Sequence, residues 1–255
     1  MVSIWQITLG FIIGLCLGSF TKAVSDRIVL EEGLGGRSHC PKCHHTLAWY
    51  DLIPILSFFM LGGKCRYCDY KIPQTNLWTE IILGLLTAAA VALSPWSPEL
   101  IFRLFIITVA AIVFLIDFQI GIIPDKIVLP AVLITVIYLA FSALSTSWAI
   151  LWWALVCAVA AAAAFVLLIL ITRGRGMGWG DVKYVFLLGL GLGFPNTLVA
   201  LFLAFLSGAM VALALIAFGK KRFGQTIPFG PFLSLGTIMA LFWGQYLISW
   251  YLLKF

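Results

Sequence analysis

Long apolar runs alternate with short polar connections from one end of the chain to the other. A helix that crosses a bilayer needs about 20 mainly apolar residues, at a rise of about 1.5 Å each. Eight runs approach this length: residues 4–24, 77–93, 101–116, 127–143, 148–171, 182–193, 197–218 and 229–253. The sixth is short and rich in glycine, so we expect it to tilt, to pack tightly or to form only half a helix. The pattern predicts an all-α integral membrane protein with about eight transmembrane helices.

Composition supports this assignment. Apolar residues make up 63% of the chain and charged residues only 10%, whereas a soluble domain carries about 25% charged residues. The expected partner of such a surface is the lipid bilayer, and the net charge of +6 does not predict binding to nucleic acid. The first apolar run has no basic segment before it and no small-residue cleavage site, so a removable signal peptide is not expected.

The distribution of Lys and Arg predicts the orientation, because these residues concentrate in cytoplasmic loops. With eight spans and an external N-terminus, all of the 16 basic residues except Arg103 and Lys254 lie on the cytoplasmic side. The inverted arrangement would place them outside. We therefore expect both termini to face outward.

The polar connection at residues 25–76 contains two pairs of cysteines. The pairs are Cys40-Pro-Lys-Cys43 and Cys65-Arg-Tyr-Cys68, separated by 21 residues, 44–64. Two such pairs are typical of a structural zinc site, in which each pair supplies two corners of a tetrahedron. A segment this small needs the binding free energy of a metal in order to fold. The sequence therefore predicts a small cytoplasmic zinc-binding domain whose ligands are Cys40, Cys43, Cys65 and Cys68.

Other interpretations of the cysteine loop stay open at this point. The thiols could form disulfides, take part in redox chemistry or stay unligated, although a cytoplasmic location disfavours disulfides. A catalytic zinc is not expected, because four cysteine ligands leave no open coordination position. His39, His44 and His45 are interpreted as surface residues, although one of them could replace a cysteine. Cys16 and Cys157 lie inside apolar runs, where a free cysteine behaves as a small apolar residue.

Two aspartates border apolar runs. Asp117 follows the run at residues 106–116, and Asp181 closes Gly176-Met-Gly-Trp-Gly-Asp181 just before another run. A carboxylate near hydrocarbon costs about 2.5–3.5 kcal/mol on insertion scales, so it usually has a function. Capping cannot explain Asp117, because the helix macrodipole disfavours a carboxylate at a helix C-terminus. Asp125, by contrast, can cap or charge-complement the start of the next helix, with catalysis as its alternative role.

Asp117 and Asp181 have the residue type and the expected membrane depth of a catalytic pair. Two aspartates that share a site hold one proton between them. The ionised member can take a proton from water while the protonated member polarises a peptide carbonyl. The sequence lacks GxSxG and HExxH motifs and has no histidine outside the cysteine loop, which argues against histidine-based triads and zinc-protease mechanisms. For Asp181, a structural ion pair with Arg173, Arg175 or Lys183 is the alternative.

Together these motifs resemble the type IV prepilin peptidases, membrane aspartic proteases with a Gly-x-Gly-Asp motif. The resemblance extends almost from end to end. It rests on Gly18-Ser-Phe20, Cys40-Pro-Lys-Cys43, Trp49-Tyr-Asp-Leu-Ile-Pro54, Gly63-Lys-Cys-Arg-Tyr-Cys68, Glu80, Ile116-Asp117, Ile123-Pro-Asp125, Gly176-Met-Gly-Trp-Gly-Asp-Val-Lys183 and Pro228-Phe-Gly-Pro-Phe232.

The resemblance implies a function and a location. Members of this family cleave the short basic leader of type IV prepilins and pseudopilins after a glycine, at the cytoplasmic face of the bacterial inner membrane. Many then N-methylate the new terminal residue with S-adenosylmethionine. Carried over, Asp117 and Asp181 become the catalytic pair and the four loop cysteines the zinc ligands. We expect an N-terminal part at residues 1–95, which contains the cysteine loop, and a membrane peptidase domain at residues 96–255.

Two other classes of function are weighed against the peptidase. A proton-coupled membrane transporter would use the aspartates as proton sites, but it is expected to have acids near the bilayer midplane and inverted-repeat halves. A zinc-anchored scaffold for pilus or secretion assembly would use the cysteine loop without catalysis. A membrane aspartic protease of another type, such as a preflagellin peptidase or a presenilin, generally lacks the four-cysteine loop.

Overall fold

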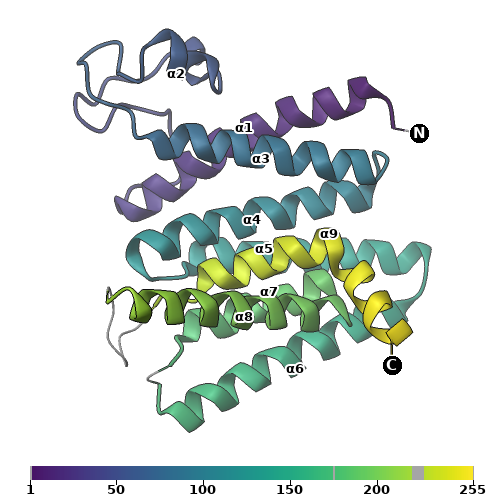
Figure 1. Ribbon diagram of the computed structural model, residues 1–255. Helices are drawn as coiled ribbons and strands as arrows, with labels where there is room; N and C mark the ends of the chain where they lie inside the picture. The colour runs from purple at the N-terminus through teal and green to yellow at the C-terminus, as the bar shows by residue number, and fades with distance from the viewer. Residues whose placement is uncertain (1, 175, 220–226, 255) are drawn as a thin grey trace. The chain divides into compact units, whose positions relative to one another are not determined.

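The protein is described by a computed structural model that covers residues 2–174, 176–219 and 227–254 (Figure 1). The described residues form helices and contain no β-strand, only two isolated β-bridges, His39 with Thr46 and Lys64 with Lys71. The helices are α1 (Ile4–Val29), the 3-10 helix η1 (Trp49–Leu52), α2 (Leu56–Met60), α3 (Gln74–Leu93), α4 (Pro98–Ile120), α5 (Asp125–Ser145), α6 (Trp148–Thr172), α7 (Trp179–Leu192), α8 (Asn196–Ala217) and α9 (Gly230–Lys254).

The predicted all-α membrane class is confirmed. Within the described residues, seven helices are long and apolar enough to cross a membrane, namely α1, α3, α4, α5, α6, α8 and α9. The remaining predicted span, the sixth, corresponds to α7, which has 14 residues and is about 21 Å long. That is shorter than the hydrocarbon core of about 30 Å, in line with the expectation that this run is atypical.

The helices extend beyond the apolar runs that predicted them. α1 continues to Val29 rather than residue 24, and α4 runs from Pro98 to Ile120 rather than from 101 to 116. Backbone hydrogen bonding continues past the last apolar residue, because a helix can end in the polar interface as well as in hydrocarbon. Asp117 consequently lies inside the last turn of α4 rather than after its end.

The chain divides into two compact units, Met1–Thr108 and Val109–Phe255. In the first unit α1 and α3 lie side by side (Figure 1). Gly10, Gly14 and Gly18, spaced four residues apart, let the two backbones approach closely. A Cβ atom at Gly14 would lie 2.4 Å from the carbonyl oxygen of Leu83. Small residues at this spacing are a common way of packing membrane helices, where no hydrophobic effect drives the contact.

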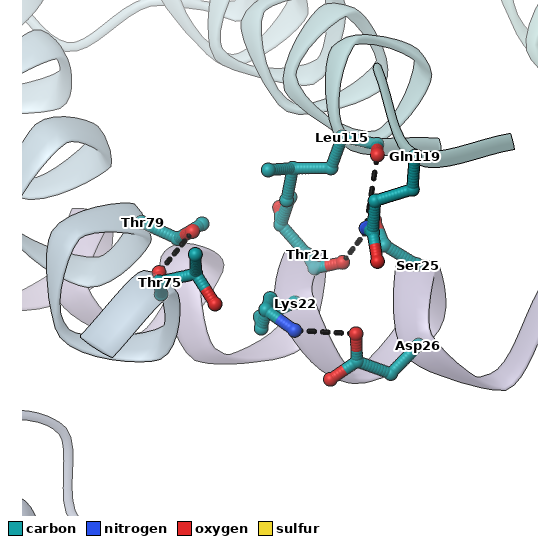
Figure 2. A network of polar contacts seen from close by, with 8 residues as sticks. All are labelled: Thr21, Lys22, Ser25, Asp26, Thr75, Thr79, Leu115 and Gln119. Atoms are coloured by element: carbon teal, nitrogen blue, oxygen red, sulfur yellow. Dashed lines mark hydrogen bonds and ion pairs between the residues drawn. The ribbon is translucent and has the colours of Figure 1, made fainter. Parts of the chain in front are cut away.

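Polar side chains at the loop end of these helices find partners within their own helix (Figure 2). The Ser25 hydroxyl donates to the carbonyl of Thr21 at 2.8 Å, and the Thr79 hydroxyl donates to the carbonyl of Thr75 at 2.7 Å. The buried ammonium of Lys22 pairs with Asp26 one turn later. These local bonds reduce the cost of placing polar groups in a buried position.

The second unit is arranged around α7, which packs against α5, α6, α8 and α9. Its side chains at Tyr184, Val185 and Leu187 have no exposed surface. A Cβ atom at Gly189 would lie 2.4 Å from the Cα atom of Ala158, so α6 and α7 are in backbone contact there. This central position explains why a helix too short to span the bilayer alone is strongly apolar.

Candidate active site and metal centre

Asp117 lies in the last turn of α4 with only 4% of its surface exposed. Its Oδ2 atom accepts a hydrogen bond from the backbone N–H of Gly230 at 2.8 Å. Gly230 is the first residue of α9, and the first N–H groups of a helix have no partner inside the helix and carry partial positive charge. The carboxylate that is unfavourable at the end of its own helix is therefore held by the start of another.

Asp181 is the third residue of α7 and is 8% exposed. Its Oδ2 atom accepts from the backbone N–H of Gly178 at 2.9 Å, which is the reciprocal half of a capping box. Asp181 thus also lies at a helix N-terminus, where the macrodipole favours negative charge.

The two predicted carboxylates come together in the second unit. The charge of Asp117 acts on Asp181 across the site, although the two residues are 64 positions apart in sequence (181 − 117). In each, one oxygen is held by a backbone N–H, and the structure gives the other oxygen no hydrogen-bond partner among the described residues. Two carboxyl groups that act on one water molecule can serve as general base and general acid.

The turn between α4 and α5 packs against the start of α7. A Cβ atom at Gly180 would lie 3.0 Å from the Cβ of Ile123, so a larger residue would separate these two segments. Both carboxylate oxygens of Asp125 accept from the ammonium of Lys183 at 2.8 Å. This ion pair fastens the first turn of α5 to the first turn of α7.

This ion pair changes the expected roles of Asp125 and Lys183. Asp125 makes no capping hydrogen bond to the backbone of α5; as the first residue of that helix it still complements the dipole, and it pairs with Lys183. Lys183 therefore does not serve as the structural partner of Asp181. Arg175, the second suggested partner, lies outside the described residues.

Sequence reasoning gave no role to several groups around the carboxylates. Gly230 is one, because only the fold shows that its N–H meets Asp117. A Cβ at this position would lie 2.6 Å from Asp117 Oδ2, so glycine is required there. Tyr184 is another: it is fully buried, bonds the hydroxyl of Ser234 at 3.0 Å and lies within the field of Asp117. The motif Pro228-Phe-Gly-Pro-Phe232 was the available signal for Gly230.

Phe229 fixes the start of α9. Its ring centroid lies 5.0 Å from that of Phe205 and 6.2 Å from that of Phe165. Aromatic contacts at these separations add to the stabilisation that comes from burial. The cluster holds the residue just before Gly230 and so sets the direction of the N–H that reaches Asp117.

In the first unit, the cysteine loop contains two hairpins with the same hydrogen bonds. In the first hairpin, the Cys40 N–H donates to the backbone carbonyl of His45, the His44 N–H to that of Cys40, and the Leu47 N–H to that of Ser38. The second hairpin repeats each of these backbone bonds 25 residues later. The N–H groups of Cys65, Asp69 and Ile72 donate to the carbonyls of Tyr70, Cys65 and Gly63, respectively. The residue after each second cysteine, His44 or Asp69, has φ of 55°. Each hairpin therefore presents its two sulfurs in the same way.

The four sulfurs form one cluster. The Sγ atoms of Cys40, Cys43, Cys65 and Cys68 all lie within 4.8 Å of one another, and those of Cys40 and Cys68 are 3.6 Å apart. A disulfide needs about 2.05 Å, whereas sulfurs about 2.3 Å from a tetrahedral zinc are about 3.8 Å apart. All four cysteines are free. The geometry fits a metal ion and does not fit disulfides.

The protonation of the cluster also fits a cation. Burial raises the pKa of the Cys40 thiol, but backbone N–H groups of Cys43 and Lys42 donate to it, and the pKa falls to about 7. At Cys68 the N–H of Tyr70 lowers the pKa, but burial and thiol hydrogen bonds to the other sulfurs raise it to about 12. The Cys40 thiol therefore ionises readily while the Cys68 thiol resists ionisation, and a bound cation would favour the thiolate form of Cys68.

The histidines lie outside the described cluster, as expected for surface residues. His39 Nε2 is 3.4 Å from a carboxylate oxygen of Glu32, and the ring of His45 packs on Tyr67 with centroids 3.7 Å apart. Cys16 in α1 and Cys157 in α6 do not belong to the cluster either.

We predict that Cys43→Ser lowers the metal content of the purified chain and exposes residues 37–72 to limited proteolysis. The physical reason is that the binding free energy of structural zinc, about 10–16 kcal/mol, supplies most of the stability of such a segment. Metal analysis of the purified protein checks this. Cys16→Ser, a free cysteine outside the cluster, is the control and keeps its metal. An unchanged zinc content in Cys43→Ser would contradict the assignment.

We predict an energetic coupling between Asp125 and Lys183. Their side chains are 52% and 44% exposed, so screening by solvent limits the coupling to about 0.2–1 kcal/mol. Thermal unfolding of Asp125→Ala, Lys183→Ala and the double variant measures this coupling. The exposed pair Arg103 and Glu99, one turn apart in α4, is the matched control within a single helix. Strictly additive losses for Asp125 and Lys183 would show that the pair does not fasten α5 to α7.

Comparison with known sequences shows the family to which the chain belongs. Residues 12–94 match the bacterial peptidase A24 N-terminal domain, and residues 104–213 match the type IV leader peptidase family. A prepilin leader peptidase/N-methyltransferase of Bacillus subtilis (strain 168) is 32% identical over 245 residues, which cover 95% of this chain and 96% of that protein. No solved structure matches.

Two further relatives carry the same name. The protein of Burkholderia pseudomallei (strain K96243) is 29% identical over 279 residues, 94% of this chain and 86% of the relative. The protein of Myxococcus xanthus (strain DK1622) is 36% identical over 124 residues, 48% of this chain and 37% of the relative. With a match to the Bacillus subtilis protein over nearly the full length of both chains, this chain belongs to the type IV leader peptidase family.

Proposed function

We propose that the chain is a membrane aspartic endopeptidase that removes the basic leader of type IV prepilins or pseudopilins after a glycine. The observation that carries the proposal is the pair of buried carboxylates, Asp117 and Asp181, each held by the backbone N–H of a glycine at a helix N-terminus. The names of the relatives agree with this activity.

Asp117 and Asp181 divide the chemistry between them. The ionised carboxylate takes a proton from a water molecule, and the resulting hydroxide adds to the carbonyl carbon of the scissile peptide bond. The protonated carboxyl donates its proton to the carbonyl oxygen. The carboxyl that took the water proton then passes it to the leaving amine, and the first carboxyl recovers its own proton when the C=O bond reforms. The N–H donors of Gly178 and Gly230 keep each carboxylate in place and favour its charge. No covalent intermediate forms on the protein.

The site is proposed to face the cytoplasm, with both termini outside. If α7 crosses as a short span, Lys220, Lys221 and Arg222 fall on the same side as the cysteine loop. If α7 did not cross, these three residues would fall on the opposite side, against the tendency of Lys and Arg to stay inside. A short crossing by α7 therefore supports this orientation. The bond to be cut in a prepilin, between a basic leader and an apolar helix, then lies at the depth of the pair.

We also propose a second activity and two functional parts. Residues 1–95 form the part that contains the zinc ligands Cys40, Cys43, Cys65 and Cys68, and residues 96–255 form the peptidase part. The zinc, when bound, supplies folding free energy to the hairpins. The second activity is N-methylation of the new terminal residue with S-adenosylmethionine, as the names of the relatives suggest. No residue of this chain is assigned to that cofactor.

The transporter and scaffold alternatives are less well supported. A proton-coupled carrier needs its acids near the bilayer midplane, whereas Asp117 is in the last turn of α4 and Asp181 in the first turn of α7. A scaffold without catalysis does not explain two buried carboxylates that meet at helix N-termini.

We predict that Asp117→Asn and Asp181→Asn each abolish leader removal from a reconstituted prepilin. Each amide keeps its size but can no longer carry the charge or the shared proton. Gel analysis measures cleavage, and mass spectrometry of the mature N-terminus with added S-adenosylmethionine tests methylation. Asp125→Asn is the control, because it changes a carboxylate outside the pair and should retain cleavage. Cleavage that survives in both pair variants would rule out the dyad.

We predict that Gly230→Ala strongly reduces cleavage while the protein remains folded. The added Cβ would lie 2.6 Å from Asp117 Oδ2, so the carboxylate must move and lose its N–H donor. A loss of about 10²–10³ in kcat is typical when one positioned donor is removed. Gly35→Ala in the cysteine loop is the control, because a Cβ atom there would meet no other atom within 4 Å. Equal rates for the two variants would contradict the role of Gly230.

A further inference from the structure

The segment at residues 49–60 exposes an unusual amount of apolar surface for a loop. Trp49 is 75% exposed, Phe59 67% and Met60 75%. Leu52, Ile53 and Leu56 are exposed as well. Elsewhere in the chain such side chains lie mostly on membrane-spanning helices, where lipid covers them. Here they belong to the polar connection between α1 and α3, and a contiguous exposed apolar patch indicates an interaction surface.

The segment is held firmly at two points. At its start, Asp51 accepts from Arg66 Nε at 2.9 Å and from the Tyr67 hydroxyl at 3.3 Å, which ties η1 to the second cysteine hairpin. At its centre, the backbone N–H of Ile55 donates to Glu80 Oε2 at 2.7 Å. The exposed side chains are therefore presented by a fixed backbone.

Ile55 adopts a strained conformation to reach Glu80. Its φ of 61° and ψ of −52°, with the N–H of Leu56 donating to Pro54 at 2.6 Å, form a γ-turn of the rare kind with positive φ. A β-branched residue adopts such angles only when its surroundings impose them. In this conformation the Ile55 N–H donates to the Glu80 carboxylate, which is 8% exposed.

The bond to Glu80 fixes the depth of the segment. α3 has 20 residues and is about 30 Å long, just enough to cross the hydrocarbon core. Glu80 is the seventh residue of α3, about 9 Å from its start. Figure 1 draws α2 beside the first turns of α3 rather than beyond its end. If α3 crosses the bilayer, this bond holds η1 and α2 near the end of the span at which α3 begins.

Charge and aromatic content agree with a lipid interface. Lys64 and Lys71, bridged across the second hairpin, are exposed and have no ion-pair partner among the described residues. Trp49 and Tyr50 are the residue types that gather at the headgroup level. Basic residues beside an apolar surface suit the anionic headgroups of a cytoplasmic leaflet.

We propose that residues 49–60 are a membrane-interface anchor, which rests its apolar side chains at the boundary between lipid headgroups and acyl chains. The anchor holds the cysteine hairpins against the bilayer surface through Asp51. It depends on α3 crossing the membrane and not on the proposed peptidase activity.

The test uses the full-length chain in lipid nanodiscs that contain acyl-brominated anionic lipids. A fluorescent amino acid replaces Phe59 in one sample and Thr46, an exposed residue of the first hairpin, in the other. Bromine quenches only fluorophores that approach the acyl chains. We expect a loss of fluorescence at position 59 and little loss at position 46, with zinc content unchanged in both. Adding a prepilin peptide should leave the quenching at position 59 in place.

A second pair of samples controls for the possibility that the fluorophore at position 59 changes the structure of the loop. The fluorophore replaces Leu56, and Phe59→Asp is introduced in the same chain. A charge on this face should reduce the quenching at position 56 without loss of zinc. Equal quenching with and without Phe59→Asp, or no quenching at position 59, would overturn the proposal. So would a position-59 signal that responds to prepilin or to a second copy of the chain but not to brominated lipid. Peptide cleavage enters none of these readouts, so a failed anchor and a failed peptidase are distinguishable.

Discussion

A buried carboxylate in a membrane protein needs a compensating donor, and the second unit is organised around meeting this need twice. Asp117 lies at the unfavourable end of α4 and takes its donor from the start of α9. Asp181 takes its donor from the residue that precedes its own helix. Because each donor is a backbone N–H, its position is set by where a helix begins. The Phe229 cluster and the contact of Ile123 with Gly180 fix those helix starts.

The membrane class and the two chemical groups were predictable from sequence, because both depend on local properties. Apolar runs of about 20 residues indicate membrane spans wherever they occur. The spacing within each CxxC pair is by itself typical of a metal site. Asp117 stood out because a carboxylate near hydrocarbon is costly and a helix C-terminus repels it. The structure brings this residue into the field of Asp181, which no local rule could show.

The groups that sequence reasoning missed are those whose role depends on contacts between distant segments. Gly230 is 113 positions from Asp117, and nothing local shows that its missing side chain makes room for a carboxylate. Lys183 is 58 positions from Asp125, whereas its nearest acid in sequence is Asp181, so proximity along the chain suggested the wrong partner. The short length of α7 was predictable from the sixth apolar run, but its packing against α5, α6, α8 and α9 was not, because those helices are separate segments of the chain.

The matching hydrogen bonds of the two cysteine hairpins have a consequence for chain length. Each hairpin sets the position of its own two sulfurs, so the sequence between them contributes no ligand. A metal held by both hairpins closes that intervening stretch into a loop, and the entropy lost on closure grows only with the logarithm of its length, about 0.6 kcal/mol for each doubling. Insertions or deletions between the hairpins are therefore inexpensive for the metal centre. The length of the intervening segment is therefore limited by its own contacts, such as those of Asp51 and Ile55, rather than by the metal centre.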